Sequence, residues 1–205
     1  MTELRVHNFS ISLDGYGAGP DQSEGNPLGV GGEQLHDWIF PSQGERTAAD
    51  DVFVQRGVDG IGATIMGRNM FGPVRGPWGS EDWRGWWGED PPFHHDVFVL
   101  THHARDPVPM AGGTTFHFVT DGIEAALDRA RAAAGDRHVR LGGGAATVQE
   151  YLRAGLLDEL HVAVVPVLLG DGERLFQDLG TTVEGWTVAE FAPSAAVAHV
   201  RLRRP

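Results

Sequence analysis

Arg137-His-Val-Arg-Leu-Gly-Gly-Gly-Ala-Ala-Thr-Val-Gln-Glu-Tyr-Leu-Arg153 is the stretch that decides the fold of this chain. Val139 and Leu141 alternate with polar residues, as in a β-strand, and a run of three glycines follows directly. A helical pattern then begins, with apolar side chains on one face. A strand, a glycine turn and a helix together bring bare backbone N–H groups to an anion at a helix N-terminus. The stretch therefore predicts a site for a phosphorylated cofactor.

A tight turn without a ligand is the alternative interpretation of the three glycines. Their spacing does not match the dinucleotide-binding fingerprint of doubly wound folds, because Thr147 occupies the place of the third glycine. A Walker A loop is excluded, because that motif needs a lysine and all 16 basic residues of this chain are arginines. The turn alone leaves the nature of the anion open.

Composition limits the class of protein. With 205 residues, 41% of them hydrophobic, the chain is expected to form one domain over 1–205. The formal charge of −12 disfavours a nucleic-acid partner. No apolar run is long enough for a bilayer and the first residues do not resemble a signal peptide, so we expect a cytoplasmic protein without a membrane partner. The absence of cysteine excludes disulfides, a thiol nucleophile and a cysteine-based zinc site.

The hydrophobic periodicity predicts an α/β fold with a mixed sheet, because strands and helices alternate and an antiparallel pair ends the chain. Asp121, with Glu124 three residues later, predicts a helix that starts with a capping box. Strands are expected at 4–12, 63–66, 97–100, 114–119, 157–165, 185–191 and 196–203, and further helices at 32–40 and 47–57.

Two long segments, 13–31 and 72–95, show no regular pattern. The second segment holds too much apolar area to stay in water, so we expect it to pack on the domain, on a partner subunit or over a ligand. The functional hypothesis is that an indole of this segment borders the substrate and stacks on a flat ring. The tryptophans concerned are Trp78, Trp83, Trp86 and Trp87.

A second pattern suited to anions lies at Ile65-Met-Gly-Arg-Asn-Met-Phe71. A strand ends there with Gly67 and Arg68, and a helical turn follows from Asn69. A guanidinium group can pair with two phosphate oxygens at once. The alternative is a surface arginine that only caps a turn.

Together these motifs resemble the dihydrofolate reductase fold, and within it the reductase domain of bacterial riboflavin biosynthesis and its stand-alone relatives. The resemblance extends over nearly the whole chain. It implies a three-layer domain, with a central mixed and mostly parallel sheet, antiparallel C-terminal strands and helices on both faces. The motifs that carry it are Ser12-Leu-Asp-Gly15, Met66-Gly-Arg68, Val99-Leu-Thr101, Gly142-Gly-Gly144 and, most specifically, Asp158-Glu-Leu160 with Pro166-Val-Leu-Leu-Gly170 and Leu175-Phe176.

The resemblance also implies NADPH as the cofactor. It places Arg68 near the adenosine 2′-phosphate, together with the turn at Thr101 and His102. The family usually has a threonine two residues after the arginine, where this chain has Met70, so a hydroxyl that could reach the pyrophosphate is missing. The cofactor-binding residues implied are Gly67, Arg68, Asn69, Thr101, His102, Gly142, Gly143, Gly144 and Ala145.

On the substrate side, the folate enzymes carry a carboxylate on their second helix. Asp51, fifteen residues before Met66, is the candidate for this catalytic position, although it or the adjacent Asp50 could be a solvated acid in the first helical turn. Candidate substrate-binding residues are Asp14, Trp86 and Trp87. Adjacent histidines such as His94-His95 and His102-His103 point to different sides of the backbone, so no metal site is expected.

The activity implied is an NADPH-dependent reductase that transfers a hydride to a small conjugated heterocycle. The first choice is a 5-amino-6-(5-phosphoribosylamino)uracil reductase-like step of riboflavin biosynthesis. Reduction of dihydrofolate, or of another small carbonyl substrate, is the alternative, and a catalytically weak NADPH-binding module is the alternative of another class. We also expect a homodimer, with its interface at an apolar sheet edge formed by Leu157–Leu169.

Overall fold

The computed structural model describes residues 2–41, 45–73, 75–79, 82–180 and 185–204. Its strands are β1 (Leu4–Ser12), β2 (Tyr16–Ala18), β3 (Ile61–Gly67), β4 (Asp96–Leu100), β5 (Val108–Pro109), β6 (Thr115–Val119), β7 (His138–Gly143), β8 (Glu159–Val165), β9 (Glu173–Arg174), β10 (Thr187–Pro193) and β11 (Ala198–Arg203). Its helices are α1 (Ala48–Arg56), α2 (Arg68–Phe71), α3 (Ile123–Ala134) and α4 (Ala145–Arg153), with short 3-10 turns η1 (Gly32–His36) and η2 (Ala111–Gly113).

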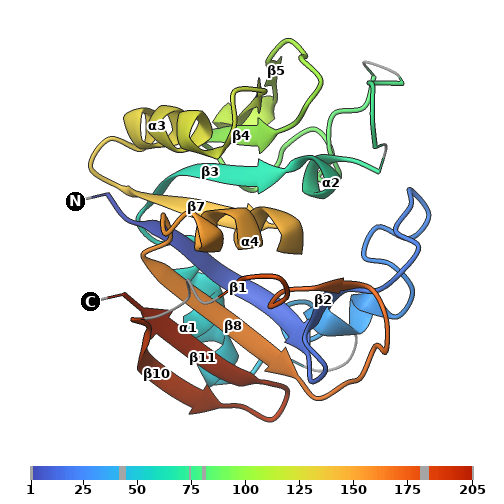
Figure 1. Ribbon diagram of the computed structural model, residues 1–205, viewed down its shortest axis with the longest axis vertical. Helices are drawn as coiled ribbons and strands as arrows, with labels where there is room; N and C mark the ends of the chain where they lie inside the picture. The colour runs from blue at the N-terminus through green and yellow to red at the C-terminus, as the bar shows by residue number, and fades with distance from the viewer. Residues whose placement is uncertain (1, 42–44, 74, 80–81, 181–184, 205) are drawn as a thin grey trace.

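In this described part of the chain, nine strands form one sheet in the order β10-β11-β8-β1-β7-β3-β4-β6-β5 (Figure 1). The six strands from β8 to β6 run parallel to one another, whereas β5 and β11 pair antiparallel to the two ends of this set and β10 pairs antiparallel to β11. The remaining strands, β2 and β9, pair with each other. The mixed, mostly parallel sheet and its antiparallel C-terminal strands are therefore confirmed.

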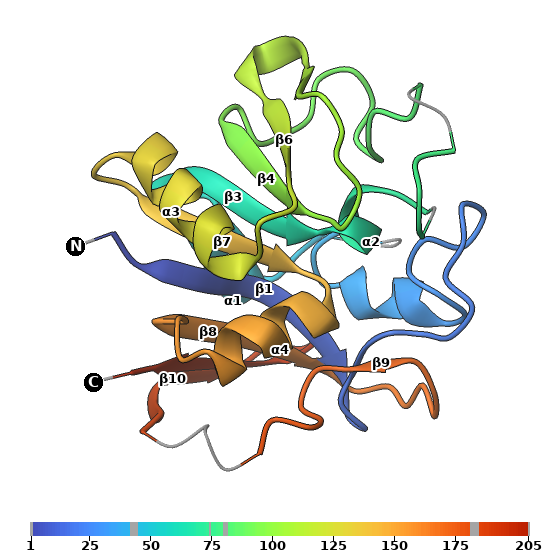
Figure 2. The same cartoon turned by 45° about the horizontal axis from the view of Figure 1, so that its top comes forward.

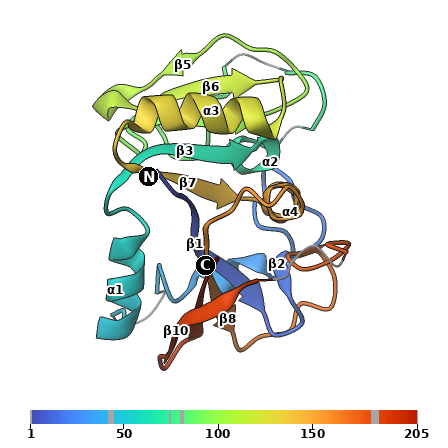
Figure 3. The same ribbon diagram turned by 60° about the vertical axis from the view of Figure 1, so that its left-hand side comes forward.

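Helices cover both faces of the sheet, as expected (Figure 2). The alternation of β7 sends Val139 and Leu141 toward α3 and α4, where they join a buried cluster with Tyr151 and Leu152. Figure 3 shows α3 beside the half of the sheet that contains β3 and β6, and α1 beside the half that contains β8 and β10. Burial of apolar area between these layers holds the domain together.

The second face of the sheet is covered by two different elements. Phe53 of α1, with Leu35 and Trp38 of the η1 region, packs on the β8 side of the sheet. The Trp-rich segment 72–95 packs on β3, β4 and β6, and Phe71 and Phe116 lie at the centre of that cluster. The expectation that this segment packs on the domain is confirmed for its described residues, and residues 74 and 80–81 lie outside them. Between the two covers lies the central strand β7.

Two helices differ from the sequence-based predictions, one in its type and length and the other in its start. The helix expected over 32–40 is a 3-10 turn of five residues. The helix expected after Asp121 begins at Ile123 behind Gly122, which has no side-chain cap, because the Asp121 carboxylate binds Arg129 instead. A capping box is present at α1, where Thr47 and Asp50 cap each other's backbone N–H groups.

The position of β8 corrects a third prediction. We expected Leu157–Leu169 to form a sheet edge, but β8 has β1 on one side and β11 on the other. Because β11 also pairs with β10, the free edge on this side belongs to β10. Every helix within the described ranges is too short or too polar to cross a membrane.

Candidate functional site

The glycine turn lies at the end of β7, between β1 and β3. Gly143 has φ +123°, and a Cβ there would lie 3.1 Å from Cε2 of Phe9. A Cβ at Gly142 would lie 3.1 Å from the sulfur of Met70. Gly144 has an ordinary φ of −69°, and the nearest atom to its added Cβ would be Glu173 Oε2, at 3.7 Å. Gly142 and Gly143 are therefore explained by close packing and, at Gly143, by a positive φ. Gly144 has neither constraint, and its lack of a side chain leaves the backbone beside it open.

This open surface is the N-terminus of α4. Gly144 is the N-cap, no side chain of the described residues caps the helix, and its first turn contains no acidic residue. Backbone N–H groups in a first helical turn have no partner within the helix, and the helix dipole favours an anion beside them. The end of α4 thus fits the phosphate site predicted from the glycine run.

A groove of about 580 Å³ lies beside this helix end, and we call it the adenosine-side groove after the role that the sequence resemblance implies for its residues. It crosses the ends of β3, β4 and β6, where the C-terminal edge of a parallel sheet commonly binds ligands. Five predicted cofactor residues line it: Gly67, Arg68, Asn69, Thr101 and His102. Residues that lie far apart in the sequence are therefore brought together.

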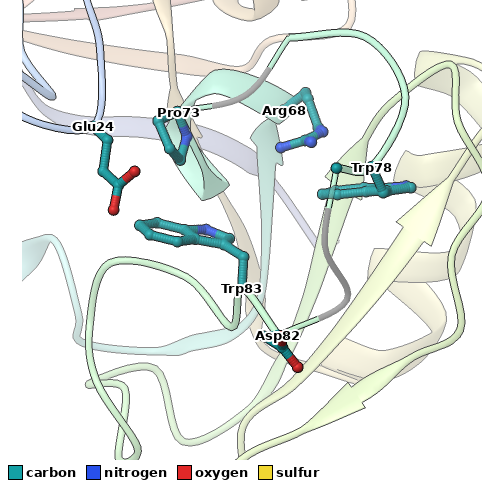
Figure 4. Close-up of a pocket in the computed structure, with 7 residues that line it drawn as sticks. Glu24, Arg68, Pro73, Trp78, Asp82 and Trp83 are labelled. Carbon is teal, nitrogen blue, oxygen red and sulfur yellow. The ribbon is translucent and has the colours of Figure 1, made fainter.

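Arg68 is held by an aromatic ring in place of a carboxylate. Figure 4 shows its guanidinium group over Trp78, and the central carbon lies 3.4 Å from the ring centroid. Its Nε and Nη1 atoms are buried and have no hydrogen-bond partner in the described part of the chain. Burial, with the nearby charge of Arg105, lowers the pKa of Arg68 to about 10, so the group stays cationic at neutral pH. An anionic ligand can therefore interact with an unneutralised charge.

Arg68 also borders a smaller cavity of about 370 Å³ on the side of the Trp-rich segment. Trp83 and Pro73 form apolar walls there, and Glu24 and Asp82 add carboxylates (Figure 4). The indole N–H of Trp83 donates to the carbonyl oxygen of Phe71, at 2.9 Å. The segment therefore braces the end of α2, and its Trp78 provides the ring on which Arg68 stacks.

A cavity of about 430 Å³, here called the substrate-side cavity, lies on the other side of the glycine turn. Asn69 lines both this cavity and the adenosine-side groove, so the two meet beside α2. The predicted residues Trp86, Trp87, Gly142, Gly144 and Ala145 line the substrate-side cavity. The remaining predicted cofactor residue, Gly143, forms the turn behind it.

The substrate-side cavity has polar atoms that the fold does not use. Asn8 Oδ1 and His36 Nδ1 are buried without a hydrogen-bond partner among the described residues. Burial lowers the pKa of His36, so its ring is neutral at neutral pH. An unpaired buried polar atom is costly, which makes such atoms candidates for contact with a bound molecule. Sequence reasoning missed both residues, because a lone polar side chain in a strand or helix pattern carries no local signal.

Asn8 owes its position to a buried chain of histidines. Its backbone has φ +59°, at a bulge where β1 shifts register against β8. The backbone N–H of Asn8 donates to Nδ1 of His161 at 3.0 Å, and Nε2 of His161 lies 3.1 Å from Nδ1 of His199. Phe53 stacks on both imidazole rings. The chain of contacts fixes the strand at the point where Asn8 reaches the cavity.

The two aspartates of α1 do not reach this cavity, which differs from the expected role of Asp51. The Asp51 carboxylate is 54% exposed and pairs with Arg46 at 2.6 Å. Asp50 is buried, but its oxygens accept hydrogen bonds from Thr47 and His199. Neither carboxylate lines the cavity, because α1 packs on the β8 half of the sheet.

Asp14 has a structural position as well. Its carboxylate accepts hydrogen bonds from the Ser12 hydroxyl and from the backbone N–H groups of Leu169 and Gly170. The hydrogen bond from Ser12, followed by the two backbone bonds, lowers the pKa of Asp14 to about 2. Asp14 does not line the substrate-side cavity, and instead ties the turn after β1 to the loop after β8.

The histidine pairs lie apart from each other. Nε2 of His95 is hydrogen-bonded to the hydroxyl of Thr64 on β3, whereas His102 lines the adenosine-side groove. Within the described ranges, no three His, Asp or Glu side chains gather in a way that could hold a metal ion.

The fold is that of the dihydrofolate reductase-like class. Dihydrofolate reductase from Enterococcus faecalis, complexed with NADP(H), has a TM-score of 0.55 and 16% identity, covering 98% of this chain and 96% of that chain. A putative riboflavin biosynthesis protein from Shewanella has a TM-score of 0.63 and 22% identity, covering 100% and 99%. A diaminohydroxyphosphoribosylaminopyrimidine deaminase/5-amino-6-(5-phosphoribosylamino)uracil reductase from Thermotoga maritima has a TM-score of 0.57 and 13% identity, covering 100% and 57%.

The chain belongs to the RibD C-terminal domain family, whose model matches residues 6–199. A curated relative, the uncharacterized protein YyaP of Bacillus subtilis, is 27% identical over 95 residues. That match covers 44% of this chain and 50% of YyaP, so it spans about half the length of the relative. The family resemblance inferred from the glycine turn and the Pro166–Gly170 motif is thereby confirmed.

Proposed function

We propose that the protein is an NADPH-dependent reductase of a small conjugated heterocycle. The observation that carries this proposal is that two cavities lie beside the N-terminal half of α4 and share Asn69 as a lining residue. A dinucleotide needs such an arrangement, because its two halves occupy separate spaces and its pyrophosphate lies between them. The family and the structural relatives, which include reductases, support the same activity.

The residues present fit the cofactor. Arg68 supplies an unneutralised cation in the adenosine-side groove, and Thr101 and His102 stand across from it at the end of β4. These residues would hold the adenosine phosphate, while the N–H groups at Gly144 and Ala145 would hold the pyrophosphate. When bound, NADPH supplies the hydride. The role of the protein is then to orient both partners and to exclude water.

The substrate-side cavity favours a flat, polar ring. Trp86 and Trp87 give it aromatic walls, and Asn8 Oδ1 offers an acceptor for an N–H group. A carbonyl-rich pyrimidine carries such N–H groups on its edge. We therefore rank a 5-amino-6-(5-phosphoribosylamino)uracil-type substrate first, and dihydrofolate or another small conjugated carbonyl compound second.

Two measurements test the proposal. Tryptophan fluorescence titrated with NADPH and then with NADH measures cofactor binding and preference, and we expect tighter binding of NADPH. Oxidation of NADPH is then followed with 5-amino-6-(5-phosphoribosylamino)uracil, dihydrofolate and a set of small conjugated carbonyl compounds. Turnover of one of them supports the reductase, whereas NADPH binding with no turnover on any would favour the catalytically weak binding module. Absence of NADPH binding would exclude both.

We also propose a homodimer, now placed at the free edge formed by β10. Val188 and Phe191 of this strand are 65% and 64% exposed, and an unpaired strand with apolar side chains is a ready pairing surface. A two-fold axis at this edge would join two sheets. Light scattering should show a dimer at micromolar concentration, and Phe191→Lys should shift it to a monomer.

A further inference from the structure

An ion pair crosses the cleft between the two cavities. Nη2 of Arg75, in the Trp-rich segment, lies 3.1 Å from Oε1 of Glu173, in β9. The same Arg75 nitrogen lies 3.4 Å from the side-chain oxygen of Gln22 in the loop 13–31. Three segments that are distant in the sequence are therefore joined at one point.

The ion pair links the linings of the two cavities. Arg75 lines the adenosine-side groove and Glu173 lines the substrate-side cavity. A carboxylate oxygen of Glu173 comes within 3.7 Å of the Cβ position at Gly144, the N-cap of α4. A ligand that extends from one cavity to the other would lie beside this ion pair, because its two partners line the two cavities.

The charges of the two partners have opposite consequences for an anionic ligand. Glu173 is the sole carboxylate among the described residues that line the substrate-side cavity, and it lies where the dipole of α4 favours negative charge. A phosphate group in the same place would be repelled by it. The Arg75 side chain is 63% exposed, long and cationic, so it can turn from a carboxylate to a phosphate at little cost.

We propose that Arg75 is a cofactor-binding residue that exchanges Glu173 for the pyrophosphate, and that Glu173 acts as an internal competitor for this anion site. The inference rests on the proposed NADPH-binding function and deepens it. Without a nucleotide, Glu173 neutralises Arg75 and stands beside the α4 N-terminus. With a nucleotide, the pyrophosphate takes Arg75, and the Glu173 carboxylate turns toward solvent.

This exchange predicts effects of opposite sign from the two halves of one ion pair. Arg75→Ala should weaken NADPH binding by about tenfold, since a charge-assisted hydrogen bond to phosphate is lost. Glu173→Gln should tighten NADPH binding by about three- to tenfold, since the shape is kept while the competing charge is removed. An ion pair that only braces the cleft would give weaker binding in both variants.

The experiment is a fluorescence titration of the full chain and both variants with NADPH, at low and at high salt. Arg84→Ala is the control, because Arg84 lies in the same segment but donates to the carbonyl oxygen of Pro109. Melting temperatures measured alongside show whether each variant stays folded. Arg75→Lys, which keeps the charge, should restore part of the affinity.

The outcomes separate the two proposals. If the wild-type protein binds no NADPH, the proposed function fails and the exchange fails with it. If the wild type binds NADPH and Glu173→Gln binds it more weakly or equally, the exchange is wrong while the proposed function stands. Tighter binding by Glu173→Gln together with weaker binding by Arg75→Ala, with a difference that shrinks in high salt, supports the exchange.

Discussion

Nε2 of His199 lies 2.9 Å from Oδ1 of Asp50, and both side chains are buried. The donor and acceptor of this hydrogen bond can be assigned from the backbone N–H of Asn8, which is linked to His199 through His161. The N–H of Asn8 can only donate, so Nδ1 of His161 accepts and its Nε2–H donates to His199. His199 then donates from Nε2 to Asp50, which makes both histidines neutral Nε2–H tautomers.

Asp50→Asn should lower the free energy of unfolding by about 2–3 kcal/mol. Burial opposes ionisation of Asp50, but hydrogen bonds from Thr47 and His199 lower its pKa, so the ionised form accepts on both oxygens. An amide must present an N–H group to one of these donors. Asp51→Asn is the matched control, because the exposed pair with Arg46 contributes about 0–1 kcal/mol. Urea unfolding measures both, and equal losses would contradict the assignment.

Stability should fall as the pH falls below about 6.5, the ordinary pKa of histidine. Burial lowers the pKa of His161 to about 2 and also lowers that of His199. Below this pH the histidines bind protons in the unfolded chain but not in the folded chain. The free energy of unfolding therefore drops by about 1.4 kcal/mol for each pH unit of acidification and each such histidine. His161→Gln, which keeps one acceptor and one donor, should flatten this slope. A parallel slope in that variant would exclude His161 as its source.

Arg68→Ala should weaken NADPH binding by about 1.5–3 kcal/mol and affect NADH much less. The reason is that its cation lies in the adenosine-side groove without a carboxylate partner among the described residues. Arg68→Lys should recover little, because an ammonium group stacks poorly on the Trp78 ring. Fluorescence titration with both cofactors gives the comparison. Equal losses for NADPH and NADH would rule out the 2′-phosphate assignment.

The glycine turn predicts different effects for neighbouring substitutions. Gly143→Val should destabilise the fold by about 1–3 kcal/mol, because a side chain at φ +123° is strained and meets the Phe9 ring. Gly144→Ala should leave the melting temperature nearly unchanged but weaken NADPH binding at least about tenfold, because its Cβ projects into the cleft. Thermal melts and NADPH titrations on the two variants would show this separation. A Gly144→Ala protein that binds NADPH normally would count against the pyrophosphate site.

Substitutions of Trp86 and Trp87, which line the substrate-side cavity, should have different effects. Trp87 packs against Phe93 and Phe116, with ring centroids 4.9 and 5.9 Å away, so Trp87→Ala should cost about 3–5 kcal/mol of stability. The Trp86 ring packs edge-on against Trp83, in the same segment. Trp86→Ala should therefore reduce turnover while NADPH affinity and melting temperature hold. Wild-type turnover in a folded Trp86→Ala protein would make the segment scaffold alone.

Local patterns were sufficient for the parts of the fold that depend on local physics. The strand expected at 4–12 and the strand–glycine–helix sequence at Gly142–Gly144 both correspond to observed elements, and in β7 the side-chain periodicity matches the alternating burial. Most of the predicted cofactor residues lie close together because the ends of parallel strands meet at one edge of the sheet.

The missed features depend on long-range packing. Asp50 and Asp51 are adjacent in the sequence, and only the docking of α1 against His199 decides which carboxylate is buried. The interior position of β8 likewise depends on strand order, which no pattern within 157–165 encodes. Asn8 Oδ1 and His36 Nδ1 lack hydrogen-bond partners among the described residues because of how distant segments pack around them, which a local sequence pattern does not encode.

The central place of β1 has a consequence for how the chain is made on the ribosome. Leu4 pairs with Val139, and Val6 pairs with Leu160, so the partners of the first strand are synthesised about 135 and 154 residues later. At about 5–20 residues per second, translation leaves this apolar strand without neighbours for roughly 8–30 seconds. Nascent chains arrested before β7 would therefore expose Leu4 and Val6, and should depend on chaperones to stay out of aggregates.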